Sequence, residues 1–191
     1  MRLGVESDSI SSAGRAAHDI GLAAILGGNL FARVGMHPAV AEVSDPRERG
    51  KVVNRAWARY GVVNGVGLAA VVAGWLGARA DEARPRRLSE RERRLALVKD
   101  GAVAALAASG LASAVAGRRF ARMEPAGAVP LTDGDQTAAE ASDAEARTKR
   151  ALNLLGAANL VSAAALSTAN ASLAQANFRR PPLRRLLRRR Y

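Results

Sequence analysis

The sequence predicts an all-α fold: an integral membrane four-helix bundle with both termini in the cytoplasm. Four long segments carry few or no charges, at about 16–36, 60–78, 100–117 and 151–178, and the segments between them are rich in arginine. The second segment runs 19 residues without a charge. A helix of that length is about 28 Å long, close to the ~30 Å hydrocarbon core of a bilayer. Together, 16–178 are expected to form the transmembrane domain.

The first span, 16–36, follows a polar, Ser-rich lead-in at 1–15. We expect this lead-in to be short and either poorly ordered or interfacial, because it lacks the basic start and apolar core of a signal peptide. Pro38 ends the span. Pairs of small residues four apart predict close helix packing in lipid; they are Ala23 with Gly27 and Ala24 with Gly28.

The second span follows a charged connector at 38–59. Ser44-Asp45-Pro46 is typical of a turn followed by a helix start, because proline suits the first helical position. We expect a short amphipathic helix there, leading into the span. Trp57 and Tyr60 at one end and Trp75 near the other fit an aromatic belt at the membrane interfaces. Small residues predict a packing seam on this span, at Gly61, Gly65, Ala70, Gly74 and Ala78.

The third span, 100–117, is Ala-rich and weakly apolar. Ser89 with Glu90 and Glu92 after it predicts a helix N-cap with acids in the first turn. A row of small residues predicts that this helix packs among others rather than alone in lipid; it consists of Ala105, Ser109, Ser113 and Gly117.

The fourth span, 151–178, follows an acidic, Pro- and Gly-containing segment at 118–150. We expect the middle of that segment to be a flexible loop that turns helical before the span. The span itself is polar for a membrane helix. At 100° per residue, Asn159, Ala163, Asn170 and Asn177 lie within about 40° of one another. This face should point into the bundle, where its amides can be satisfied.

Charge predicts the orientation. The termini and the connector between spans two and three carry 17 Arg and Lys residues, against 11 on the other side. The positive-inside rule therefore places both termini in the cytoplasm. The basic tail at 179–191 should contact anionic lipid head groups, which attract nearby arginines by roughly 1 kcal/mol each. Its arginines are Arg179, Arg180, Arg184, Arg185, Arg188, Arg189 and Arg190.

The first half resembles a known family. It reads HDIGLAAILGGNLF at 18–31, HPAV at 37–40, RERGKVV at 47–53 and RYG at 59–61. This pattern is similar to that of bacterial four-helix membrane proteins with a domain of unknown function, which are distantly like the copper-resistance D type. The resemblance covers about a third of the chain. It implies a four-helix membrane fold and little about activity.

Composition limits the chemistry. The chain has no cysteine, which excludes disulfides, thiol catalysis and thiolate metal sites, and it has only two histidines. We expect no catalytic residue, no cofactor and no metal, and we expect that the protein is not an enzyme. A proton or metal site of His18 and Asp19 with Met36 and His37 is one hypothesis. The favoured alternative is that His18 and Asp19 are polar residues of a helix start, where the dipole stabilises Asp19.

Several polar residues are expected inside the membrane: His18, Asp19, Asn29, Asn64, Asn159 and Asn170. Interhelical hydrogen bonding is the favoured role for the asparagines, and a polar pathway is the alternative. Three functions remain open. The first is a structural or accessory membrane protein that packs against other membrane subunits or a second copy. The second is a small transporter or channel-like protein for an ion or small molecule. The third is a soluble helical protein that binds nucleic acid, which the net charge of +12 allows but an aromatic content of 4% disfavours.

Overall fold

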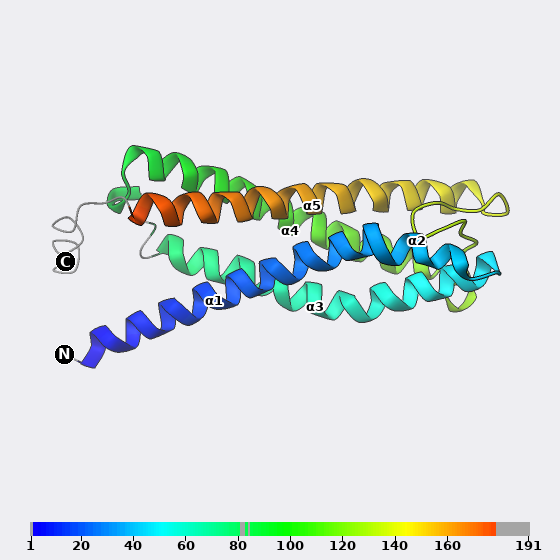
Figure 1. The fold of residues 1–191 in the computed structure, drawn as a ribbon, viewed down its shortest axis with the longest axis horizontal. Helices are drawn as coiled ribbons and strands as arrows, with labels where there is room; N and C mark the ends of the chain where they lie inside the picture. The colour runs from blue at the N-terminus through cyan, green and yellow to red at the C-terminus, as the bar shows by residue number, and fades with distance from the viewer. Residues whose placement is uncertain (1, 81–82, 84, 179–191) are drawn as a thin grey trace.

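The computed structural model describes residues 2–80, 83 and 85–178. Four long helices run alternately up and down: α1 (Arg2–Phe31), α3 (Pro46–Ala80), α4 (Glu90–Ala121) and α5 (Asp143–Phe178). The start of α1 and the end of α5 lie at the same end of the bundle (Figure 1). No strand occurs within the described ranges, apart from one isolated bridge between Leu131 and Thr137. The all-helical prediction is confirmed. By length and composition, all four helices could cross a membrane.

The helices are longer than the predicted spans. Helix α1 includes residues 2–15, which were expected as a lead-in. Beyond Phe31 the helical path continues through a π-helical turn (η1, Ala32–Met36), α2 (His37–Ala39) and a 3-10 turn (η2, Val40–Glu42). The basic tail at 179–191, with all seven of its predicted lipid-contacting arginines, lies outside the described residues.

Helix α3 begins where the sequence predicts. Pro46 is its first residue, and Asp45 Oδ1 accepts a hydrogen bond of 2.8 Å from the backbone N–H of Arg47. The helix predicted to lead into the second span is present and is continuous with that span, because α3 runs unbroken for 35 residues. No proline follows Pro46 within α3, so every later residue keeps the backbone N–H that the helix needs.

Two matching caps start the last two helices. The backbone N–H of Ser89 donates to Glu92 Oε2 over 2.8 Å, and the backbone N–H of Glu92 donates to Ser89 Oγ over 3.4 Å. This capping box confirms the predicted N-cap. Ser142 and Glu145 repeat the arrangement at the start of α5, with distances of 2.7 and 3.4 Å. This second box was not predicted, although its Ser-x-x-Glu spacing is the same.

A glycine seam joins α1 to α3. A Cβ on Gly21 would lie 2.6 Å from the carbonyl oxygen of Gly67, and one on Gly74 would lie 2.8 Å from that of Gly14. A Cβ on Gly28 would overlap the Tyr60 ring. These contacts repeat every seven residues along both helices, as the seam of a left-handed antiparallel pair does. The close backbone approach therefore requires glycine at Gly21.

The seam is not the one predicted from spacings of four. Gly27, Gly61 and Gly65 have no atom within 4 Å of an added Cβ, so they lie on open faces of their helices. Of the predicted α3 row, Gly74 does pack closely, against α1. A pair of small residues one turn apart shows that a close approach is sterically allowed. It does not say which face of the helix a partner occupies.

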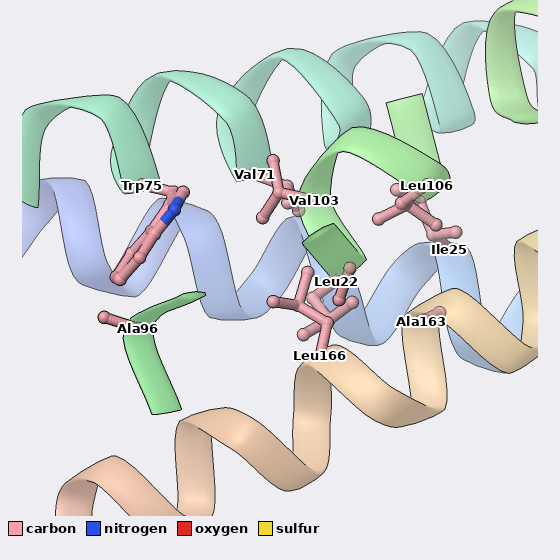
Figure 2. Packing of buried hydrophobic residues seen from close by; sticks show 10 residues of the cluster. Leu22, Ile25, Val71, Trp75, Ala96, Val103, Leu106, Ala163 and Leu166 are labelled. Carbon is pink, nitrogen blue, oxygen red and sulfur yellow. The ribbon is translucent and has the colours of Figure 1, made fainter. Parts of the chain in front are cut away.

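The main core lies where all four helices meet (Figure 2). Leu22 of α1, Val71 of α3, Leu106 of α4 and Leu166 of α5 point toward one another and are buried. Trp75 belongs to this core and is only 5% exposed. The prediction that Trp75 lies in an interfacial aromatic belt is therefore wrong, because its ring packs inside the bundle.

A second core lies under the segment that joins α4 to α5. Val129 and Leu131 are fully buried and pack with Val40, Val53 and Phe120. We call residues 122–142 the cap. It lies at the end of the bundle opposite to the start of α1 (Figure 1). The cap has a defined conformation with buried side chains, which differs from the flexible loop expected from its composition.

Candidate functional site: polar side chains inside the bundle

Buried and partly exposed polar side chains that contact other helices or the cap occur at three levels along the bundle. We call them the central amide network (Asn29, Ser109, Asn159), the α1-start cluster (His18, Asp19, Trp75, Lys99, Asp100, Asn170) and the cap cluster (His37, Trp57, Asp135, Lys149). Each level joins elements that are far apart in the sequence. These levels include every predicted intramembrane polar position except Asn64.

The central amide network links three helices. Asn159 of α5 is 7% exposed. Its Nδ2 donates to Ser109 Oγ over 3.3 Å and to the Leu106 carbonyl over 3.4 Å, both in α4. Its Oδ1 accepts from Asn29 Nδ2 of α1 over 3.4 Å. Both ends of one amide are thus used between helices, as the inward-facing asparagine face predicts.

Asn64 does not join this network. Its Oδ1 is buried and has no hydrogen-bond partner among the described residues. The prediction that it hydrogen-bonds within the bundle is therefore not met by this oxygen. The pattern of one helix cannot show whether a hydrogen-bond partner lies opposite on another helix.

His18 and His37 lie at opposite ends of the first helical path. About 28 Å of helix separates residues that are 19 apart. His18 Nδ1 donates to the Val71 carbonyl of α3 over 2.8 Å, whereas His37 bonds to the cap. A single metal or proton site that combines His18 and Asp19 with Met36 and His37 is therefore excluded by distance. The described residues also contain no group of three or more candidate metal ligands.

Asp19 and Asn170 do come together. Asn170 Nδ2 of α5 donates to Asp19 Oδ1 of α1 over 3.1 Å. His18 is 4% exposed. Because its Nδ1 donates to a carbonyl, Nε2 is the nitrogen without a hydrogen when the ring is neutral. Neither this nitrogen nor Asn170 Oδ1 has a hydrogen-bond partner in the described part of the chain.

The contacts of the charged side chain of Lys99, which belongs to the same cluster, were not predicted. Lys99 Nζ lies 4.2 Å from the centroid of the Trp75 ring. Trp75 Nε1 donates to Asp100 Oδ1 over 2.8 Å, and Arg79 donates to Asp100 Oδ2 over 3.0 Å. These contacts tie the end of α3 to the start of α4. The sequence did contain a signal, because Lys99 directly precedes the third predicted span and Asp100 is the first residue of that span.

The cap cluster holds the cap to α1, α3 and α5. Trp57 Nε1 donates to His37 Nε2 over 3.2 Å, and His37 Nδ1 donates to Asp135 Oδ1 over 2.9 Å. Lys149 Nζ donates to the carbonyl of Gly134. The backbone N–H of Gly134 in turn donates to the His37 carbonyl over 3.0 Å. The sequence analysis missed this cluster, since its members are spread over more than 100 residues.

His37 and Lys149 lie just outside the spans at 16–36 and 151–178. Burial lowers the pKa of His37 below its ordinary value, and the nearby Asp135 carboxylate partly opposes this. Burial also lowers the pKa of Lys149. The lowered pKa of His37 favours the neutral ring, which is the state that can accept the Trp57 hydrogen bond.

Comparison with known proteins does not extend this picture. No family model, curated protein or solved structure matches the chain. The resemblance to bacterial four-helix membrane proteins with a domain of unknown function, distantly like the copper-resistance D type, therefore stays a prediction. At all three levels, polar side chains join one helix or loop of the bundle to another. These contacts hold the bundle together.

Proposed function

We propose that this protein is a structural or accessory component of a membrane, with four helices crossing the bilayer and both termini in the cytoplasm. The observation that carries the proposal is the apolar outer surface of the helices. Large apolar side chains are exposed on every helix, and the interior is also mainly apolar, with a few amide, imidazole and charged side chains buried between the helices. Such a surface is suited to lipid, which cannot satisfy polar groups but solvates apolar ones.

The exposed apolar side chains occur on every helix. Ile20 is 70% exposed, Val66 67%, Val115 68% and Leu154 73%. The most apolar 18-residue window of each helix is no more than 28% buried within the chain. A water-soluble domain of this size would turn such residues inward, because burying one of them stabilises by roughly 1.5–3 kcal/mol.

The interior favours assembly over transport. Between the central amide network and the α1-start cluster, the four-helix core is filled by fully buried Val71, Leu106 and Leu166 (Figure 2). A polar pathway would need continuous polar or water-filled space there. The amides of Asn159 and Asn170 are instead separated by apolar packing.

The proposal is tested by fractionation. A tagged full-length chain should stay in the membrane pellet after carbonate at pH 11 and after high salt, and should leave it only with detergent. Cysteines introduced near the start of α1 should react with an impermeant thiol reagent only after cells are opened, whereas cysteines at cap residues should react in intact cells. Extraction by carbonate would contradict the membrane assignment, and the reverse labelling would contradict the orientation.

Replacing Asn159 with alanine should destabilise the bundle by about 1 kcal/mol, the scale of interhelical hydrogen bonds in membranes. The loss follows because Asn29 and Ser109 each lose their hydrogen bond to α5 and keep only bonds within their own helices. Gln175→Ala, on an exposed part of α5, is the matched control and should leave the thermal midpoint in detergent unchanged. If Asn159→Ala instead abolished an ion flux in proteoliposomes and left the thermal midpoint unchanged, the transport function would be supported.

A further inference from the structure

A basic and apolar face lies at the end of α4 next to the cap. Val115, Arg118, Arg119, Arg122 and Met123 line a surface hollow of about 480 Å³. Their spacing of three and four residues places them on one side of the helix. The hollow lies at the opposite end of the bundle from the end of α5 (Figure 1). It is therefore separate from the head-group contacts expected for the basic tail.

The three arginines have uncompensated charge. None of them makes an ion pair or a side-chain hydrogen bond with any residue in the described ranges. Other arginines on this end of the bundle are engaged: Arg47 pairs with Glu124 at 3.1 Å, and Arg33 donates to the Asn153 carbonyl over 2.9 Å. The C-terminal dipole of α4 favours positive side chains in general. The dipole does not explain why three arginines line the same hollow.

The same face becomes apolar toward the middle of the helix. Leu111 lies two turns and Val115 one turn before the arginines, and they are 63% and 68% exposed. Along one stripe the surface therefore changes from side chains that suit acyl chains to side chains that suit a phosphate. Arginine guanidinium groups bind phosphate oxygens through paired hydrogen bonds.

We propose that this face binds an anionic phospholipid, with its phosphate among Arg118, Arg119 and Arg122 and an acyl chain along Leu111 and Val115. The site rests on the proposed membrane location, and it deepens that function by naming a lipid class for the leaflet next to the cap. A free phosphate could satisfy the arginines but leaves Leu111 and Val115 without an occupant. The apolar half of the stripe therefore favours the lipid.

The test measures lipid binding by the detergent-purified, delipidated full chain. Phosphatidylglycerol should raise the thermal midpoint, and native mass spectrometry should show the bound lipid. Phosphatidylcholine and inorganic phosphate should do neither. The triple variant Arg118→Gln, Arg119→Gln, Arg122→Gln should bind phosphatidylglycerol about 100-fold more weakly, given what each arginine adds near an anionic surface.

Two further variants make the result decisive. Arg86→Gln, Arg91→Gln, Arg93→Gln removes the same charge from exposed positions at the other end of the bundle and should bind like the wild type. Leu111→Ser, Val115→Ser keeps all arginines and should also bind weakly. Equal binding by all variants, or an equal shift with inorganic phosphate, would overturn the lipid site while leaving the membrane location intact. A chain that stays monodisperse without detergent would instead overturn the membrane location itself.

Discussion

Replacing Gly21 with alanine is expected to destabilise the bundle by about 3 kcal/mol, the upper end of the usual cost of overpacking. The new Cβ would lie 2.6 Å from the Gly67 carbonyl oxygen, so α1 and α3 would have to move apart. Because the obstacle is backbone, no rotamer change relieves it. The loss should appear as a lower thermal midpoint in detergent and a lower yield of membrane-inserted protein.

Gly65→Ala is the matched control, since it lies in α3 with no atom within 4 Å of the added Cβ. There alanine should be neutral or stabilise by about 0.5–1 kcal/mol through its better helix propensity. Gly67→Ala should give an intermediate loss, because its Cβ would lie 3.0 Å from the Gly21 carbonyl oxygen. Equal midpoints for Gly21→Ala and Gly65→Ala would show that α1 and α3 do not pack through this seam.

Replacing Gly50 with alanine is expected to cost about 2–3 kcal/mol and to loosen the cap. A Cβ at Gly50 would overlap the carbonyl oxygen of Val129, which is fully buried. Two neighbouring hydrogen bonds hold the cap in this register. Leu131 N–H donates to the Pro46 carbonyl over 3.0 Å, and Asn54 Nδ2 donates to the Gly127 carbonyl over 2.8 Å. All of these contacts are lost together if the cap shifts.

The measurement is limited proteolysis of the detergent-purified chain, with cleavage sites mapped by mass spectrometry. Gly50→Ala should be cut rapidly within residues 122–142, and the wild type slowly. Gly101→Ala, at an open position of α4, should behave like the wild type. If the wild-type cap is cut as fast as that of the variant, the cap is not held by this contact and the flexible loop expected from its composition is correct.

The cap shows why composition misleads at this position. Residues 122–142 combine acidic, Gly, Pro and Ala residues, a mixture typical of an exposed loop. Yet Gly127 adopts a positive φ of 74°, which glycine tolerates, and the chain then turns Val129 and Leu131 into the second core. These two apolar residues are too few to form a periodic pattern, so their burial depends on Val53 and Phe120 beneath them.

The sequence by itself determined the four helices, the proline that starts α3, the capping box of α4 and the inward direction of Asn159. Each of these depends on local backbone chemistry or on the periodicity of one helix. Only the tertiary structure decided that α1 and α3 meet at glycines seven residues apart, that His18 and His37 belong to separate clusters, and that the cap is ordered. These features depend on which face of one helix meets which face of another, and that choice is made by steric fit between segments that the sequence holds far apart.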